Sequence, residues 1–261
     1  MKKVQNKKIL PFQLVSIVMP VYNERKTIEA IIKRVQKVEI PKELIIVDDG
    51  STDGTREWLC EQYGQASLDS LNEKEARKKS CESLGDRSHV RVLIHPDNQG
   101  KGAALKTGFR SARGEIVIVQ DADLEYSPEE YPRLLEPLIA DQADVVYGSR
   151  FLRASEGKRP LVSYLGNKIF TALTNAATGL SLTDVWTGYK VFKKEVLEDI
   201  SLEESGFEME LELTIKVAQK KWRIVEVPIS YVPRSKAEGK KIRWRDGIQS
   251  IKTIFRYRKA S

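Results

Sequence analysis

Short apolar runs alternate with segments of helical periodicity along the first 150 residues of the chain. Short, nearly unbroken apolar runs are typical of strands buried in a parallel sheet, whereas apolar positions three or four residues apart are typical of helices. Such alternation favours an α/β fold with a Rossmann-like, mostly parallel sheet flanked by helices and joined by right-handed crossovers. The predicted strands are residues 14–22, 44–47, 90–94, 116–120 and 143–147, each followed by a helix or loop.

The second half of the chain is less regular. Residues 161–182 predict a helix and a loop over the sheet edge, 208–220 an amphipathic helix, and 223–227 an edge strand. From residue 243 onward, apolar side chains fall at helical spacing and predict one apolar face on a basic helix. The residues of that face are Trp244, Ile248, Ile251 and Phe255.

These patterns predict one catalytic domain with basic ends. We expect a basic N-terminal tail over residues 1–13, a catalytic domain over 14–233, and a basic C-terminal segment over 234–261. Residues 65–88 are rich in charged side chains and poor in apolar ones, which predicts an exposed insertion within the domain.

The charge and the composition of the chain indicate which partners and which cellular location to expect. The net charge of +7 is local: residues 234–261 contain ten Lys/Arg and two Asp/Glu, whereas the remainder contains 34 and 35. A local basic segment favours an anionic partner, such as a phosphate or a membrane surface. No run of 18 apolar residues and no signal peptide are visible, which predicts a cytoplasmic protein with at most a peripheral membrane contact.

Two aspartates, Asp121 and Asp123, directly follow the apolar run 116–120. Alternate residues of a strand lie on the same side, so both carboxylates are expected to face one point outside the strand end, where α/β sheets bind ligands. A solvated loop would carry the same residues. However, Asp48 and Asp49 end a neighbouring strand, and four carboxylates at one edge repel each other without a cation. The sequence therefore predicts Mg²⁺ or Mn²⁺ at Asp121 and Asp123, holding the diphosphate of an activated sugar.

The other two aspartates suggest recognition of a nucleobase. Either Asp48 or Asp49 is predicted to accept the imide N–H of uracil, or the amino and imide N–H groups of guanine, while the other caps the following turn. Pro20, Tyr22 and Glu24 lie at the end of the first strand and are expected to line the same nucleoside pocket.

Basic residues near the strand ends are candidates for phosphate binding. Lys101 lies in a Gly-Lys-Gly loop without a complete phosphate-binding signature, so a phosphate contact and a plain turn remain equal alternatives. Arg150 directly follows a strand, where its guanidinium can meet phosphate oxygens in a bidentate manner. The cluster before the C-terminal helix favours binding of an anionic group, although solvated surface charge is the alternative. That cluster contains Arg234, Lys240 and Lys241.

Other classes of function fit the residues less well. His89 and His95 are the only histidines, which argues against a Ser–His hydrolase or a histidine metal site. The first strand is followed neither by the G-x-G-x-x-G of a dehydrogenase nor by the Gly-rich basic loop of a sugar nucleotidyltransferase. No nucleic-acid motif accompanies the basic segment, so we expect no nucleic-acid partner. A non-catalytic nucleotide-binding module remains an alternative.

Several stretches taken together resemble the family 2 glycosyltransferases with the GT-A fold. They are V-S-I-V-M-P-V-Y-N-E, I-I-V-D-D-G-S-T-D-G-T, N-Q-G-K-G-A-A-L-K-T-G and V-Q-D-A-D-L-E-Y-S-P-E. The stretches V-Y-G-S-R, D-V-W-T-G-Y-K and P-R-S-K-A-E-G-K-K-I-R-W-R-D-G are similar to the branch that contains dolichyl-phosphate mannose synthases and polyprenyl-phosphate glucosyltransferases.

The resemblance implies roles for individual positions. It places Asp48 and Asp49 in the nucleotide-binding carboxylate motif and Asp121-Ala122-Asp123 in the metal-binding D-x-D, with Ala122 part of the nucleotide-sugar site. Glu125 is expected to reach the metal; mannose synthases often have Gln there, so the donor stays open between UDP-glucose and GDP-mannose. Basic positions near the donor and acceptor phosphates are matched by Arg150, Arg234 and Lys241.

The reaction implied is transfer of a hexose to a polyprenyl phosphate with inversion at C1. The divalent ion would neutralise the leaving diphosphate, with Arg150 as a second cation. A phosphate acceptor is already anionic and needs no strong base, whereas a hydroxyl acceptor needs one, for which Asp184 is the candidate.

Many relatives carry C-terminal transmembrane helices, which are not seen here, so we expect the apolar face of the basic helix to contact the membrane surface or, alternatively, to pack on the domain.

Overall fold

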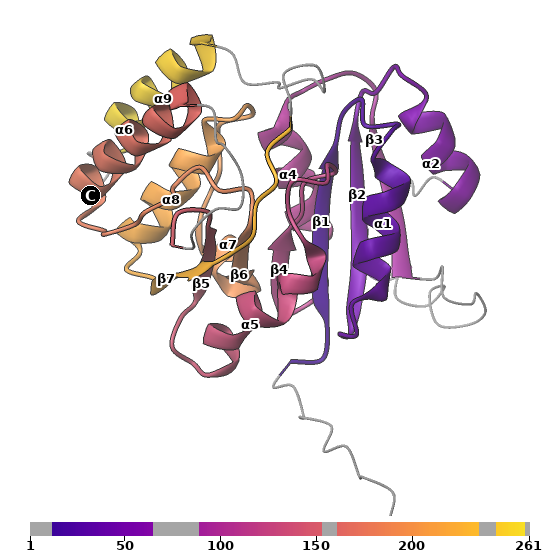
Figure 1. Cartoon of the computed structure of the whole chain (residues 1–261), viewed down its shortest axis with the longest axis horizontal. Coiled ribbons are helices and arrows are strands. Elements are labelled where there is room, and N and C mark those ends of the chain that lie inside the picture. The colour runs from indigo at the N-terminus through magenta and orange to yellow at the C-terminus, as the bar shows by residue number, and fades with distance from the viewer. Residues whose placement is uncertain (1–11, 65–88, 153–160, 235–243, 259–261) are drawn as a thin grey trace, which may run out of the picture.

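The computed structural model describes residues 12–64, 89–152, 161–234 and 244–258. This part of the chain forms one seven-stranded sheet with the order β3-β2-β1-β4-β6-β5-β7 (Figure 1). The strands are β1 (Val15–Val21), β2 (Lys42–Asp49), β3 (Val90–His95), β4 (Ile116–Val119), β5 (Val145–Ser149), β6 (Lys190–Lys193) and β7 (Ile224–Pro228). The predicted α/β fold with a mostly parallel sheet is confirmed.

Strand β6 was not predicted, and it lies in the middle of the sheet. It pairs antiparallel with both β4 and β5, whereas the other neighbouring strands pair in parallel. Its antiparallel direction places its first residue, Lys190, at the edge where β4 and β5 end, since Ile118 pairs with Val191 and Tyr147 with Lys190. Consequently, the loop that precedes β6 is at the same edge as Asp121 and Arg150.

Helices cover both faces of the sheet. The cluster on one face contains α1 and α5 side chains, and the cluster on the other contains α4 and α8 side chains. Helices α6 and α9 lie side by side and pack against α8 (Figure 1). The helices are α1 (Ile28–Lys37), α2 (Thr55–Tyr63), α4 (Lys101–Ser111), α5 (Tyr131–Ile139), α6 (Leu161–Thr178), α7 (Lys194–Asp199), α8 (Met209–Gln219) and α9 (Trp244–Tyr257), with a 3₁₀ turn at Pro128–Glu130.

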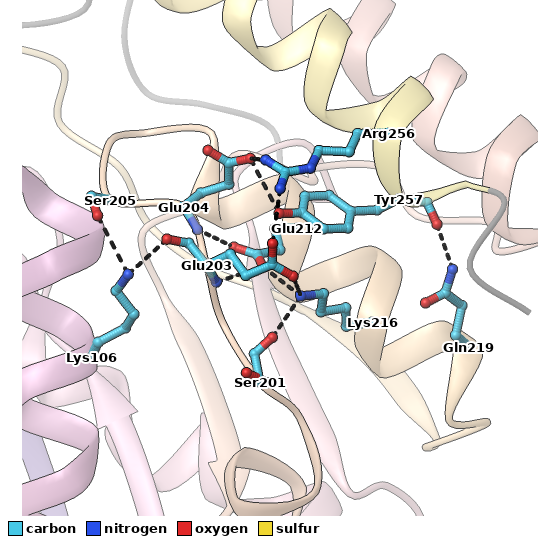
Figure 2. A network of polar contacts seen from close by, with 10 residues as sticks. All are labelled: Lys106, Ser201, Glu203, Glu204, Ser205, Glu212, Lys216, Gln219, Arg256 and Tyr257. Atoms are coloured by element: carbon cyan, nitrogen blue, oxygen red, sulfur yellow. Dashed lines mark hydrogen bonds and ion pairs between the residues drawn. The ribbon is translucent and has the colours of Figure 1, made fainter.

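A polar network joins the loop before α8 to three helices (Figure 2). The buried Glu212 carboxylate accepts hydrogen bonds from the backbone N–H groups of Glu203 and Glu204 at 2.7 and 2.8 Å. The Lys106 side chain of α4 donates to the Glu203 carbonyl at 2.9 Å, and Arg256 of α9 forms an ion pair with Glu203 at 3.0 Å. The network therefore fixes α4 and α9 relative to α8.

Helix α9 faces the protein with a different side from the predicted apolar face. Its buried side chains include Ile254 and Tyr257, whereas Ile251 and Phe255 are 39% and 50% exposed. The side chains of Trp244 and Ile248 lie outside what the structure describes. The alternative that α9 packs on the domain is thus confirmed for one side of the helix, but the part of the apolar face that is described points away from the protein.

Some predictions concern segments that the structure does not describe. The insertion 65–88, the residues Lys240 and Lys241, and almost all of the N-terminal tail lie outside the described ranges. Within the described part of the chain, no helix combines the length and the apolar character needed to cross a bilayer.

Candidate active site

Asp121 and Asp123 lie just beyond the carboxyl end of β4, and each is paired with a cation. The Asp121 carboxylate is 2.8 Å from Lys101 Nζ, and the Asp123 carboxylate is 3.4 Å from the Arg234 guanidinium. The two aspartate side chains are 20% and 16% exposed, so they remain accessible from outside. The two carboxylates supply the hard oxygen ligands that Mg²⁺ prefers, and in this structure each of them pairs with a cation.

Aromatic side chains and one glycine hold the Asp121 loop in place. The Gln120 side chain accepts hydrogen bonds from the hydroxyls of Tyr131 and Tyr189 at 2.7 and 2.8 Å. Tyr126 stacks on Tyr189 with the ring centroids 4.7 Å apart, and its hydroxyl accepts the N–H of Gly188 at 2.9 Å. The Gly188 backbone lies so close to Asp121 that a Cβ there would overlap its Oδ2. The carboxylate is therefore held by surrounding contacts.

Lys101 belongs to a chain of buried charges. Its Nζ lies 2.8 Å from Asp121 and 3.3 Å from Glu210 of α8, and Glu210 lies 2.5 Å from Lys190. Burial favours the neutral amine, but the Asp121 and Glu210 carboxylates outweigh it and raise the pKa of Lys101. Lys101 thus remains charged beside the aspartate pair, and its contact with a phosphate group stays a prediction.

Arg234 closes the other side of the aspartate pair. Its guanidinium donates to both Glu24 carboxylate oxygens at 3.1 and 2.9 Å, and its backbone N–H donates to Glu125 at 2.7 Å. Burial raises the pKa of Glu125, and the nearby negative charge of Asp121 raises it further. The hydrogen bond from the Arg234 N–H lowers this pKa but does not outweigh burial. Glu125 thus anchors the segment that carries Arg234, and its role as a metal ligand stays a prediction.

Arg150 forms a buried pair with Asp184. The guanidinium donates to both carboxylate oxygens at 2.7 Å, and the Arg150 backbone N–H adds a third bond at 3.0 Å. The guanidinium also lies 5.1 Å from the centroid of the Tyr231 ring. The Asp184 side chain is fully buried. This geometry disfavours the general-base role that we expected for Asp184, because its oxygens are already occupied in orienting Arg150.

The carboxylates that end β2 point into the fold. Asp49 accepts the backbone N–H groups of Gln99 and Gly100 at 3.0 and 2.8 Å, and it lies 2.7 Å from His95 Nδ1. Asp48 accepts from Arg56 at 2.9 Å through Oδ2, whereas its Oδ1 is buried without a hydrogen-bond partner. Asp49 therefore shapes the loop before Lys101, and Asp48 retains an unused acceptor.

The loop after β1 lies against the loop after β2. The Asn23 backbone adopts a positive φ of 54°, and its N–H donates to Ser51 Oγ at 2.9 Å. The Glu24 N–H donates to Thr55 Oγ1 at 3.0 Å. Pro20 is the second-last residue of β1 and is partly exposed, and Tyr22 directly follows the strand. These contacts bring the predicted nucleoside-lining residues to the edge that also carries Asp48.

Two features decide whether a divalent ion fits this site. The donor set is two partly exposed carboxylates, each of which pairs with one cation in this structure. Among the described residues, no group of three or more His, Cys, Asp or Glu is arranged to hold a metal by itself. Asp121 and Asp123 thus fit an ion whose remaining ligands come from phosphate oxygens or water, which is the usual situation for Mg²⁺. Ala122 lies between them and is buried, with its carbonyl oxygen 3.0 Å from the Thr27 hydroxyl oxygen.

Sequence reasoning missed Glu210 and Lys190. Both are buried, although acidic and basic side chains are rarely buried unless they are paired. The signal for Glu210 is its position on the apolar side of the helix 208–220, where Glu212 is also buried. Lys190 carries no comparable signal, because only the antiparallel strand β6 brings it next to Glu210.

Substitution of Gly188 tests whether the backbone fixes Asp121. The Cβ of Gly188→Ala would overlap Asp121 Oδ2 and come within 2.9 Å of Tyr126, so we expect the carboxylate to shift. Residues that orient metal ligands typically change affinity by about 10–100-fold, and we expect a loss of this size in Mn²⁺ affinity and turnover. Gly166→Ala is the control, since a Cβ there meets no atom within 4 Å. Equal Mn²⁺ affinity in both variants would show that the Gly188 backbone does not fix the position of Asp121.

Comparison of the sequence with known proteins identifies one family and several relatives. The profile of glycosyl transferase family 2 matches residues 16–201. Polyprenol monophosphomannose synthase of Mycolicibacterium smegmatis is 31% identical over 246 residues, covering 90% of this chain and 85% of the relative. Undecaprenyl-phosphate mannosyltransferase of Micrococcus luteus is 32% identical, with 85% of both chains covered. Dolichol-phosphate mannosyltransferase of Pyrococcus furiosus is 28% identical over 93% of this chain but 61% of the relative.

Solved structures share the fold. Glucosyl-3-phosphoglycerate synthase from Mycobacterium tuberculosis, in complex with Mn²⁺, UDP and glucosyl-3-phosphoglycerate, superposes with a TM-score of 0.68. It is 22% identical in sequence, and the match covers 94% of this chain and 80% of that protein. At this identity the likeness establishes the fold, which is that of the GT-A glycosyltransferases.

Proposed function

Because the chain belongs to glycosyl transferase family 2, we propose that it transfers a hexose from a nucleoside-diphosphate sugar to a polyprenyl phosphate, with inversion at C1. The observation that carries this proposal is the contact of two cations with one pair of carboxylates at the sheet edge. Lys101 contacts Asp121 and Arg234 contacts Asp123, while Arg150 follows β5 at the same edge and pairs with Asp184. A site with so many cations favours a reaction between two phosphate-bearing substrates.

The aspartates and the cations would have different roles in binding the donor diphosphate. Asp121 and Asp123 would hold a divalent ion, which supplies a Lewis acid for the diphosphate when bound. Lys101 and Arg150 place positive charge where the leaving group becomes more negative. Arg150 is held rigidly by Asp184, so little reorganisation of this cation is needed during the reaction.

The contacts of Asp184 support a phosphate acceptor. A hydroxyl acceptor needs a base with a free oxygen, but both Asp184 oxygens accept from Arg150. A phosphate acceptor is already anionic and needs no base, so its attack on C1 requires only that Arg150 and Arg234 position it. The geometry therefore favours a lipid phosphate over a hydroxyl acceptor.

The nucleotide half of the donor would bind beside β1 and β2. Asp48 is the better candidate for the base, because its buried Oδ1 lacks a hydrogen-bond partner, whereas Asp49 already receives two backbone N–H groups. Both uracil and guanine offer an N–H to such an oxygen, so UDP-glucose and GDP-mannose remain the donors to test. Pro20 and Tyr22 would lie against the nucleoside.

The function is tested by comparing acceptors. The protein is incubated with Mn²⁺ and UDP-glucose or GDP-mannose, together with a short polyprenyl phosphate, the matching polyprenol, or no acceptor, and the release of nucleoside diphosphate is measured. We expect fast release only with the lipid phosphate. Equal release with the polyprenol would favour a hydroxyl acceptor. Donor binding without release under any condition would favour the non-catalytic nucleotide-binding alternative.

We propose further that α6 and α9 meet the membrane from which the lipid acceptor comes. Their outward sides carry exposed apolar residues, and Arg258 lies 4.3 Å from the Phe255 ring centroid. Lys168 and Lys252 add positive charge for anionic head groups. Arg256, in contrast, forms ion pairs with Glu203 and Glu204. The exposed apolar residues are Leu165 and Ile169 of α6 and Ile251 and Phe255 of α9.

Charged substitutions on this face are expected to weaken binding to vesicles. Ile251→Glu/Phe255→Glu replaces two half-exposed apolar side chains, and burial of such side chains contributes about 1 kcal/mol or more each, so the partition coefficient should fall about tenfold or more. Flotation with vesicles containing anionic phospholipid measures it. Ile139→Glu, at an equally exposed position of α5, is the control. Vesicle binding that falls equally in both variants, or in neither, would contradict a specific membrane face.

A further inference from the structure

Each aspartate of the pair shares its counter-cation with a second carboxylate. Lys101 lies between Asp121 at 2.8 Å and Glu210 at 3.3 Å. Arg234 lies between Asp123 at 3.4 Å and Glu24 at 2.9 Å. The two halves of the site therefore repeat one arrangement, in which a cation bridges a D-x-D aspartate and a carboxylate from another element.

The second carboxylates are held in place independently of the aspartates. Glu210 is 8% exposed and accepts from the fully buried Lys190 at 2.5 Å. Glu24 accepts from the Thr27 hydroxyl at 2.9 Å. Neither contact involves the Asp121 or Asp123 carboxylate, so both contacts are compatible with an ion on the aspartates.

The backbones that carry Lys101 and Glu210 are also fixed relative to each other. The N-termini of α4 and α8 are in contact, because a Cβ on Gly102 would lie 2.9 Å from Met209 Cβ. The Ala103 N–H donates to the Ser205 carbonyl at 3.1 Å, and Lys106 extends the contact into the network of Figure 2. Rotation of the Lys101 side chain alone is therefore enough to move its ammonium group from Asp121 toward Glu210.

We propose that Lys101 and Arg234 are exchangeable counter-cations: when a divalent ion binds Asp121 and Asp123, they withdraw to Glu210 and Glu24. This inference rests on the proposed metal site and adds four residues that set metal affinity without being ligands, namely Lys101, Arg234, Glu210 and Glu24. A positive group displaced within a poorly solvated site is costly unless it has another carboxylate. Glu210 and Glu24 supply that carboxylate, and Lys190 positions Glu210.

A double-mutant cycle measured on Mn²⁺ alone, without substrate, tests the exchange. Free and bound Mn²⁺ are distinguished by electron paramagnetic resonance. Lys101→Met removes the competing cation, so we expect Mn²⁺ to bind about tenfold more tightly. Glu210→Gln leaves Lys101 with only Asp121, so we expect Mn²⁺ to bind about tenfold more weakly. In Lys101→Met/Glu210→Gln the cation that the exchange would displace is absent, so the affinity should match that of Lys101→Met.

The last variant distinguishes exchange from simple attraction. If Glu210 acted only as a distant negative charge, its removal would weaken Mn²⁺ binding equally with and without Lys101, and the exchange would be refuted. Glu208→Gln, half a turn away, is the control and should leave Mn²⁺ affinity unchanged. The pair Arg234→Gln and Glu24→Gln forms a second cycle with the same expected signs, so the test does not depend on one variant folding.

Failure of the exchange can be told from failure of the proposed function. Mn²⁺ that binds the wild-type chain, is lost in Asp121→Asn, and is indifferent to Lys101→Met and Glu210→Gln would overturn only the exchange. Mn²⁺ binding that Asp121→Asn leaves unchanged would overturn the metal site itself. A lower melting temperature of Glu210→Gln with wild-type Mn²⁺ affinity would show that the Glu210–Lys190 pair serves only the fold.

Discussion

Asp121→Asn/Asp123→Asn is expected to lower the turnover number by about a thousand-fold or more, because the negative charge that holds the divalent ion is lost. Both substitutions keep the size and shape of the side chain. The cations that contact the aspartates retain carboxylate partners, since Lys101 also contacts Glu210 and Arg234 also contacts Glu24. The variant should therefore fold normally, and its loss of activity would report on chemistry. Turnover is measured as release of nucleoside diphosphate with saturating donor.

The control for this variant is an aspartate at the same edge of the sheet. Asp97→Asn changes an exposed residue in the loop after β3 and should leave turnover within about twofold of wild type. If the double variant retained wild-type turnover, the assignment of the D-x-D would be wrong. If it lost turnover together with its cooperative thermal transition, the aspartates would be needed for folding.

Arg150→Met is expected to lower turnover by about a hundred-fold, through loss of a fixed cation near the donor phosphates. It also leaves the fully buried Asp184 without its partner, which typically costs about 3–5 kcal/mol of stability. A loss of activity in this variant alone would therefore be ambiguous. The measurement needs both the turnover number and the melting temperature.

The variant Arg150→Met/Asp184→Asn separates the two effects. It removes the buried unpaired charge, so the melting temperature should return most of the way to that of the wild type. Turnover should stay low, because the cation is still absent. If turnover recovered with stability, Arg150 would serve the fold alone. Arg150→Lys is a further comparison: it keeps the charge but loses the two parallel hydrogen bonds to Asp184, and an intermediate loss is expected.

The buried strands and the polar residues at their ends could be predicted from the sequence, because a buried strand is a short run of apolar residues. The runs 14–22 and 116–120 are almost entirely apolar, and the observed strands β1 and β4 fall within them. The polar residues that follow such runs are at the carboxyl edge of a parallel sheet by topology alone. The same topology places Asp121, Asp123 and Arg150 at one edge of the sheet.

Strand β6 and its charged residue could not be read in the same way. The segment Lys190–Lys193 is four residues long and has a lysine at each end, so its composition does not indicate a central strand. Lys190 is buried because Glu210, twenty residues later, lies 2.5 Å away. Such a pair depends on how β6 and α8 meet, and a single sequence gives no signal for that.

The C-terminal helix shows how periodicity can identify a face without identifying its partner. The spacing of Ile251 and Phe255 correctly placed them on one side of a helix, but apolar spacing alone suggests that this side packs on the protein. The structure instead buries Ile254 and Tyr257 against the neighbouring helices. Tyr257 also donates to Glu204 at 3.2 Å. Polar contacts therefore help to decide which side of α9 packs on the protein, and apolar periodicity gives no information about such contacts.

The most direct measurement is transfer of a labelled hexose to lipid by protein treated with EDTA, before and after Mn²⁺ is restored. With labelled UDP-glucose or GDP-mannose and a short polyprenyl phosphate, we predict that label enters the organic phase with one of the donors only when Mn²⁺ is present. Label that reaches the lipid equally well in EDTA, or that fails to reach it with either donor after Mn²⁺ is restored, would contradict the account.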